Sequence, residues 1–199
     1  PRTAPLAIGD RLPPRALAGY RALEATGPGF AADALDDWAV MVLMGQRAAH
    51  NAALSPDAGV EAGLTQHFRA ANKPIGGLET AKSQLMLFET LDPATQRALL
   101  IRAADRAGDA VADVRTLTEA WRRGDVAKLE AEINEDVDAV PAARKAIITD
   151  RNRAWAAWIT RRMDRPGTVL IAVGAGHLVG DDGVPSRLAA QGMRVSRVQ

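Results

Sequence analysis

The 199-residue chain contains no cysteine. This absence excludes structural disulfides, zinc–thiolate centres, iron–sulfur clusters and catalysis by a thiol nucleophile. Aromatic residues are scarce at 4%, although hydrophobic residues together make up 47% of the chain. We therefore expect a core of leucine, valine, isoleucine and alanine, with the four tryptophans as its bulkiest members. This hydrophobic content is typical of a folded protein rather than a disordered one.

The chain also lacks an excess of either charge. It carries 25 basic and 24 acidic residues, which gives a formal net charge of +1. Proteins that bind nucleic acids usually concentrate basic charge on one surface, so we predict no nucleic-acid partner. A membrane-spanning helix needs about 20 consecutive apolar residues. The longest apolar runs, 38–44 and 169–173, are much shorter, and we predict no membrane span.

Hydrophobic periodicity and helix-start residues predict a helix-rich α/β fold, in which many helices flank a small sheet of few short strands. The length fits one domain. Its expected helical portion covers about 14–164, and a strand–turn–strand unit follows at about 167–198. The predicted helices are 14–25, 33–51, 57–72, 80–91, 93–108, 111–123, 125–133, 140–164 and 184–191, and the predicted strands are 75–79, 168–173 and 193–198.

The most informative segment is the predicted strand 168–173 with the Gly174-Ala175-Gly176-His177 sequence that follows it. Its glycines have a spacing that resembles a dinucleotide-binding loop. However, too little chain follows for the second strand and acidic residue that such a unit needs. Two interpretations stay open. The glycines let the chain turn so that His177 reaches a pocket as a metal ligand or general base, or His177 makes a purely structural hydrogen bond.

Glu79 follows the predicted strand 75–79 in the same way. If this strand and 168–173 are neighbours in a parallel sheet, Glu79 and His177 emerge at one edge. A carboxylate and an imidazole together suit a divalent cation such as Mn, Fe, Co or Zn. The alternative is that Glu79 caps the helix after it, because acidic residues favour the first turn of a helix.

Other polar residues carry weaker signals. Asn152 lies in the predicted helix 140–164, where asparagine is a poor helix former, and it either orients a ligand or reaches a backbone carbonyl. Trp155 and Trp158, three residues apart on this helix, are expected in the core. His50 and His67 lie on predicted helices without a second histidine four residues away, so we expect no zinc-binding helical pair.

Several segments together resemble the TraB/GumN family, which includes the Tiki proteases. The residues that carry this likeness cover roughly 55–198. They are Gly59-Val60-Glu61-x-x-Leu64, Lys73-Pro74-Ile75-Gly76-Gly77-Leu78-Glu79-Thr80-x-x-x-Gln84, Ala120-Trp121-Arg122-Arg123-Gly124-Asp125, Asp150-Arg151-Asn152-x-x-Trp155-x-x-x-Ile159 and Gly174-Ala175-Gly176-His177-Leu178-x-Gly180-x-x-Gly183.

The resemblance implies an α/β fold related to the erythromycin-esterase and ChaN-like group. It also implies a metal-dependent hydrolase, peptidase or esterase, located in the periplasm or cell envelope. Glu79 and His177 match its catalytic and metal-ligating positions. Supporting positions of the family pattern are matched by Gln84, Arg151, Asn152, Gly174 and Gly176.

One family motif has no counterpart in the chain. The resemblance implies two Gly-x-x-His motifs, and Gly174–His177 matches only the second. We therefore expect the chain to be the C-terminal two-thirds of a family member, with its first strands upstream of Pro1 and a metal site that is incomplete without them. Such a chain is either an inactive part of a hydrolase or a domain that binds peptides without cleaving them. A sheet edge left unpaired by missing strands also predicts a homodimer.

Overall fold

The computed structural model describes residues 2–198, which form two compact units. The first unit extends to Arg115 and the second begins at Thr116. The helices of the first unit are α1 (Pro14–Glu24), α2 (Asp37–Asn51), α3 (Val60–Ala70), α4 (Ala81–Glu89) and α5 (Pro93–Asp105), with short 3₁₀ turns at Ile8–Asp10, Ala32–Ala34 and Pro56–Ala58. The boundary lies within α6 (Ala110–Arg123).

Residues recognisable in the sequence begin several of these helices. Proline occupies the first position of α1 and of α5, where its missing N–H costs no hydrogen bond. Thr80 caps α4 reciprocally with Ser83. Asp92 caps α5 by accepting hydrogen bonds from the backbone and hydroxyl of Thr95. These hydrogen bonds stabilise the ionised carboxylate and lower the pKa of Asp92 from its ordinary value of 3.8.

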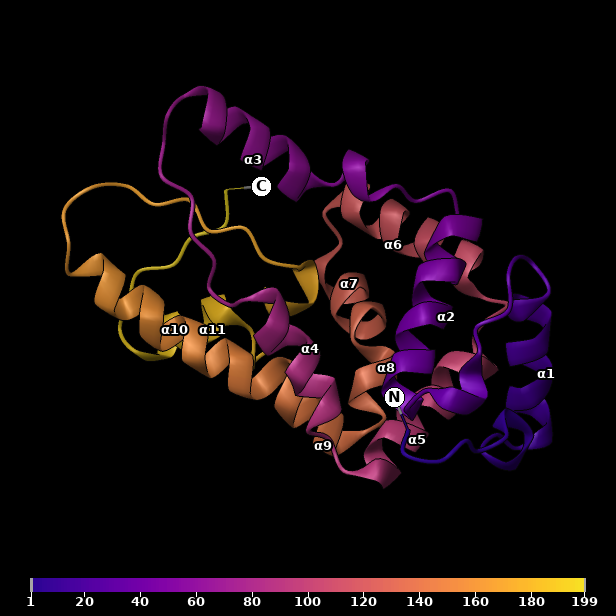
Figure 1. The fold of residues 1–199 in the computed structure, drawn as a ribbon. Helices are drawn as coiled ribbons and strands as arrows, with labels where there is room; N and C mark the ends of the chain where they lie inside the picture. Colours follow the sequence, from indigo (N-terminus) through magenta and orange to yellow (C-terminus); the bar gives the residue numbers. More distant parts are fainter. Residues whose placement is uncertain (1, 199) are drawn as a thin grey trace. The chain divides into compact units, whose positions relative to one another are not determined.

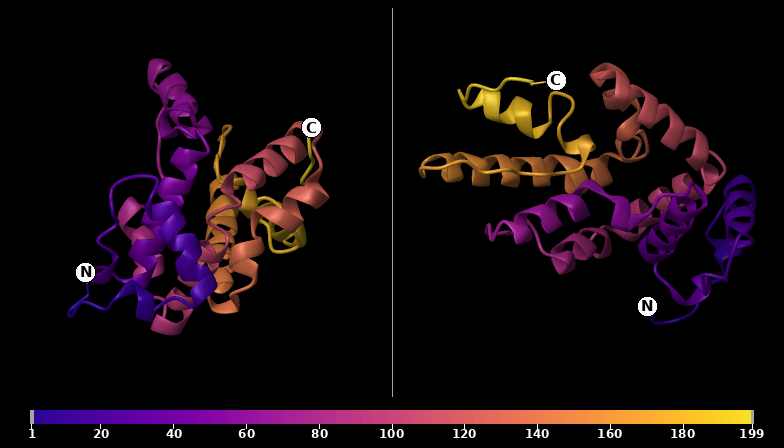
Figure 2. Two further views of the ribbon diagram at one scale, coloured as in Figure 1. Left: turned by 90° about the vertical axis from the view of Figure 1, so that its right-hand side faces the viewer. Right: turned by 90° about the horizontal axis from the view of Figure 1, so that it is seen from above.

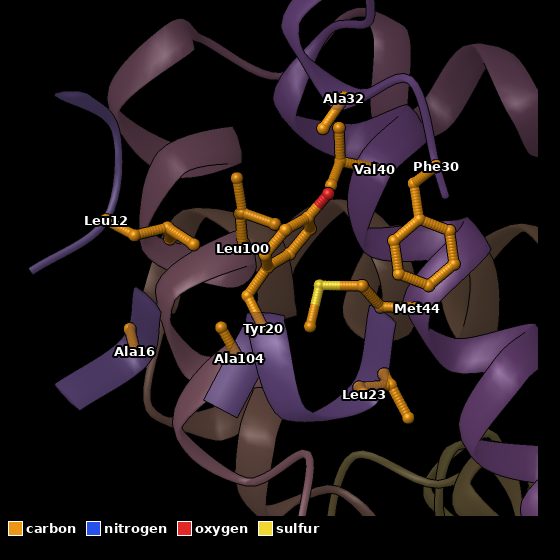
Figure 3. Packing of buried hydrophobic residues seen from close by; sticks show 10 residues of the cluster. All are labelled: Leu12, Ala16, Tyr20, Leu23, Phe30, Ala32, Val40, Met44, Leu100 and Ala104. Atoms are coloured by element: carbon orange, nitrogen blue, oxygen red, sulfur yellow. The ribbon is translucent and has the colours of Figure 1, made fainter. Parts of the chain in front are cut away.

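The first unit has one hydrophobic core, which α1, α2 and α5 share (Figure 3). Gly19 permits the close approach of α1 to α5, because a Cβ at this position would lie 2.1 Å from the carbonyl oxygen of Ala104. The ring centroids of Tyr20 and Phe30 are 5.7 Å apart. Burial raises the pKa of the Tyr20 phenol, and its hydrogen bond to Glu24 adds to this effect. The buried members of the core are Leu12, Ala16, Tyr20, Leu23, Phe30, Ala32, Val40, Met44, Leu100 and Ala104.

A buried ion cluster lies beside this core. The Arg11 guanidinium donates to Asp37 Oδ1 at 2.8 Å and to the carbonyl oxygens of Ala32 and Leu35. Arg97 donates to the other oxygen of Asp37 at 2.6 Å. Because Asp37 begins α2 and Arg97 lies on α5, this cluster links the irregular N-terminal segment to two core helices.

The second unit consists of α7 (Val126–Ile133), α8 (Glu135–Asp138), α9 (Pro141–Arg144), α10 (Asp150–Met163) and α11 (Val184–Ala190), together with part of α6. A π-helical segment, Lys145–Thr149, joins α9 to α10. The helices α10 and α11 lie side by side, as Figures 1 and 2 show. An irregular segment, 166–174, returns the chain from the end of α10 to a 3₁₀ turn at Ala175–His177.

The predicted sheet is wrong, because none of residues 2–198 forms a strand. Segments 75–79, 168–173 and 193–198 are irregular, and the expected strand–turn–strand unit at 167–198 contains a 3₁₀ turn and α11 instead. Val169, Ile171 and Val173 are partly buried and alternate with exposed residues, as in a strand. Alternation alone does not make a sheet, because each strand needs a partner for its backbone hydrogen bonds.

Two predictions about partners depend on these elements. The homodimer was argued from an unpaired sheet edge, and that argument is lost because residues 2–198 include no sheet. Among the described residues, no helix is both long enough and apolar enough to cross a bilayer.

Candidate functional site around His177

His177 ends the 3₁₀ turn Ala175–His177 and is only 8% exposed. Its backbone N–H donates to the carbonyl oxygen of Gly174 at 2.9 Å and closes the turn. Asn134 Nδ2 donates to the carbonyl oxygen of Gly176 at 2.8 Å. A Cβ at Gly176 would lie 2.5 Å from Asn134 Oδ1, so the turn and this asparagine approach closely only because residue 176 is glycine. Gly176 therefore shapes the turn that presents His177.

This close approach predicts a difference between two neighbouring substitutions. We expect Gly176→Ala to lower the free energy of unfolding by about 1–2 kcal/mol, because Asn134 must move and lose its hydrogen bond. Gly174→Ala is the matched control: its Cβ would meet only the His177 ring, at 3.9 Å, and we expect a change below about 0.5 kcal/mol. Urea unfolding of both variants measures the difference, and equal effects would contradict this account of the turn.

The facing side chains come from α10, immediately after the π-helical segment. A π turn inserts an extra residue into a helix and shifts which residues share a face, and such turns are frequent at functional sites. Arg151 Nη1 donates to the carbonyl oxygen of Ile147, within the π segment, at 3.1 Å. Arg151, Asn152 and Trp155 all contact the imidazole of His177.

Hydrogen bonding fixes the tautomer of His177. The backbone carbonyl of Asp182 can only accept, so the Asn152 amide must donate to it, and the distance from Nδ2 is 2.8 Å. Asn152 Oδ1 then faces His177 Nδ1 at 2.7 Å, which requires a proton on Nδ1. Arg151 Nη1 is 3.2 Å from Nε2 and can only donate, so Nε2 carries the lone pair. Asn152 thus reaches a backbone carbonyl, one of its two predicted roles, and also orients the imidazole. Its other predicted role, to orient a ligand, stays a prediction.

Trp155 forms one wall of this cluster. Its ring centroid is 4.5 Å from that of His177, with 53° between the planes. The Arg151 guanidinium carbon lies over the same indole ring, 4.7 Å from its centroid. Such stacking holds a guanidinium in place without using its N–H donors. His177 and Arg151 are therefore positioned against each other by a shared aromatic surface.

The nearby carboxylates are paired with other groups. Asp182 accepts from Arg187 and from the Thr149 hydroxyl. Asp150 is bonded to Lys145 and Arg153, each at 2.6 Å. The hydrogen bond from the Lys145 ammonium lowers the pKa of Asp150, with smaller contributions from nearby arginines. Both aspartates are therefore engaged with cations.

Glu79 and Gln84 belong to the first unit, whereas His177 belongs to the second. Gln84 Nε2 donates to Glu79 Oε2 at 3.3 Å. The N-cap of α4 is Thr80 rather than Glu79. The pairing of Glu79 with His177 was expected from two neighbouring parallel strands, and the described residues form no such strands.

The described residues do not fit a resident metal ion. Across residues 2–198, no three histidine, aspartate or glutamate side chains converge in a metal-binding group. His177 Nε2 has the lone pair that a metal ligand needs, but the Arg151 guanidinium occupies the position where a cation would sit. The metal therefore stays a prediction.

Sequence reasoning identified His177, Asn152 and Arg151 but missed three residues around them. Trp155 was expected only as core, and neither Asn134 nor Asp182 was singled out. The spacing of Arg151 and Trp155, four residues apart on one helix, was the available signal for their stacking. Asn134 contacts Gly176 from 42 positions away and Asp182 contacts Asn152 from 30 positions away, and no local pattern marks such contacts.

The second unit thus presents a preorganised histidine–asparagine–arginine–tryptophan cluster within a helical fold. The chain was compared with known protein families. The family model described as the TraB/PrgY/gumN family matches residues 4–197. The chain therefore belongs to this family. Because the match spans nearly the whole chain, the expectation of a C-terminal two-thirds is not confirmed. Neither the curated proteins nor the solved structures compared with the chain gave a match.

Proposed function

We propose that the chain is a hydrolase of peptide or ester bonds in which His177 is the general base. The observation that carries the proposal is the fixed tautomer of His177, with Nδ1–H bonded to Asn152 and the lone pair on Nε2. A neutral imidazole that another residue orients is the usual general base near neutral pH. Membership of the TraB/PrgY/gumN family supports placing the function at this cluster, because the segments of the family likeness include it.

The reaction follows from the atoms present. Nε2 takes a proton from water as the water oxygen attacks the carbonyl carbon, and the protonated imidazole then gives this proton to the leaving amine or alcohol. Asn152 holds the Nδ1–H throughout, so the ring keeps one orientation. Arg151 lies against Nε2, and a substrate oxygen bound by its guanidinium is held beside the base. Substrate binding must draw Arg151 from Nε2 before water can reach that nitrogen.

The test is hydrolysis of a peptide library and of short-chain esters by the purified chain. Two conditions are compared: excess EDTA, and added Mn, Co or Zn. We expect turnover that EDTA does not abolish. Activity only with added metal would overturn the metal-free mechanism and support the metal-dependent hydrolase. Absence of turnover in every condition would overturn the proposal.

A non-catalytic peptide-binding domain is the second candidate. One observation favours it: the Arg151 guanidinium covers Nε2, and His177 is largely buried, so the base is blocked in this conformation. The same peptide library distinguishes the two functions. Peptides retained by the chain and recovered intact in every metal condition would establish binding without cleavage.

A further inference from the structure

Asp182 is attached at two points to the helical segment that supplies the partners of His177. Its backbone carbonyl accepts from Asn152 Nδ2 at 2.8 Å, and its carboxylate accepts from the hydroxyl of Thr149. Thr149 ends the π segment and Asn152 lies three residues further on, so the two side chains are about one helical turn apart. From the loop between His177 and α11, Asp182 therefore bridges the junction between the π segment and α10.

Arg187 on α11 holds Asp182 in this position. Its Nε donates to the Asp182 carbonyl oxygen at 3.1 Å, and its Nη2 donates to the Asp182 carboxylate. The carbonyl oxygen thus receives one donor from Arg187 and one from Asn152, which together use both of its lone pairs. The loop is also tight, because a Cβ at Gly183 would lie 2.7 Å from the carbonyl oxygen of Val179. The side chain of Asp182 and this tight loop therefore fix the place of the Asp182 carbonyl.

The Asp182 carbonyl decides which way the Asn152 amide points. The oxygen and the NH₂ group of an asparagine have nearly the same shape, so their hydrogen-bond partners fix the orientation of the amide. A reversed amide would present Nδ2 to His177 Nδ1 and would require the lone pair there. The proton would then lie on Nε2, which could no longer accept one from water. Asn152 is fully buried, so bulk water does not replace the carbonyl as its acceptor.

We infer that Asp182 is a positioning residue for the general base: acting through Asn152, it holds His177 in the tautomer with the lone pair on Nε2. This inference rests on the proposed hydrolase and adds a residue on which the geometry of its base depends. Asp182 transfers no proton itself. Its carboxylate holds its carbonyl in place, the carbonyl orients the Asn152 amide, and the amide orients the imidazole.

The test reads the tautomer of His177 from the ¹⁵N chemical shifts of its ring nitrogens, which differ strongly between a protonated nitrogen and one with a lone pair. Spectra of the whole chain are recorded at about pH 8, above the unperturbed imidazole pKa of about 6.5. His50→Gln and His67→Gln identify the signals of the other two histidines, which are both exposed. We expect the unmodified chain to show a protonated Nδ1 and an unprotonated Nε2 at His177.

In Asp182→Ala, we expect the ring nitrogens of His177 to shift toward the averaged values of the exposed histidines, because the Asn152 amide is free to reverse. In the hydrolysis assay, kcat should fall about tenfold with KM within about twofold, since the base is no longer held in one orientation. Asp182→Asn keeps an acceptor of the same shape and should retain more of the original tautomer. Asp181→Ala is the matched control: Asp181 is exposed and adjacent, and its loss should change neither the spectra nor kcat.

A folded Asp182→Ala chain that keeps the tautomer of the unmodified chain would overturn the inference, as would an unmodified chain with the His177 proton on Nε2. If Asp182→Ala fails to fold, Thr149→Val takes its place, because it removes only one donor to the carboxylate. We expect a smaller shift in the same direction there, and no shift would overturn the inference.

These outcomes are distinguishable from failure of the hydrolase. Hydrolysis by the unmodified chain, with a His177 tautomer that does not depend on Asp182, refutes the positioning role and leaves the hydrolase standing. A tautomer that depends on Asp182, without hydrolysis of any substrate, refutes the hydrolase and leaves the hold of Asp182 on the imidazole standing.

Discussion

His177→Gln is expected to lower kcat/KM for peptide or ester hydrolysis by about 10²–10⁴-fold, the usual contribution of a general base. Glutamine retains a polar side chain of similar reach but has no nitrogen that accepts a proton near neutral pH. The loss should appear in kcat, because His177 transfers a proton rather than anchoring the substrate. Steady-state kinetics on the substrates that the unmodified chain cleaves measures this effect.

A matched substitution separates this loss from general damage. His50 is exposed on α2 and is not among the residues of the His177 cluster, which all belong to the second unit, so His50→Gln should leave kcat/KM within about twofold. Urea unfolding of His177→Gln shows whether the variant is folded. A folded His177→Gln enzyme with unchanged kcat would remove His177 from the reaction.

The largest loss of stability is expected for Arg11→Ala. We predict that it lowers the free energy of unfolding of the first unit by about 3–5 kcal/mol, as is usual when one partner of a buried ion pair is removed. The side chain of Arg11 is fully buried and that of Asp37 is 5% exposed. The variant leaves a buried carboxylate with weaker compensation and also removes the donor to the Ala32 and Leu35 carbonyls. Urea unfolding measures the change.

Arg15→Ala provides the control for this prediction. Arg15 also faces an aspartate, Asp105 at 3.8 Å, but its side chain is 87% exposed. Exposed ion pairs contribute little because water screens them, so we expect a change below about 1 kcal/mol. Similar losses in the free energy of unfolding of the two variants would show that burial does not make the Arg11–Asp37 pair more stabilising than an exposed ion pair.

The positions of the helices were predictable because their signals are local. Pro14, Thr80 and Asp92-Pro93 begin or cap helices within one residue of the predicted starts. The predicted helix 140–164 was nearly right in extent, but periodicity did not reveal the π segment at Lys145–Thr149. A π turn changes the register by one residue, which is too small a change for an apolar pattern to show.

The predicted sheet failed because strand formation depends on distant partners. The alternation around Val169 and Ile171 satisfies the local requirement for a strand, yet no described segment pairs with it. The geometry of the site could not be predicted for the same reason, because it too depends on contacts between distant residues. His177 and Asn152 were marked by residue type and position. Their mutual hydrogen bond joins residues 25 positions apart and was not visible in the sequence.

The hydrophobic core of the first unit can be completed only late in the synthesis of that unit. The core includes Tyr20, Val40 and Met44 together with Leu100 and Ala104. The ribosome adds Leu100 60 residues after Val40, and Ala104 later still. Until α5 has emerged from the ribosome, the apolar faces of α1 and α2 lack the helix that covers them, and Asp37 lacks its hydrogen bond from Arg97. The nascent chain therefore passes through a long interval with exposed hydrophobic surface, in which binding by a chaperone competes with aggregation.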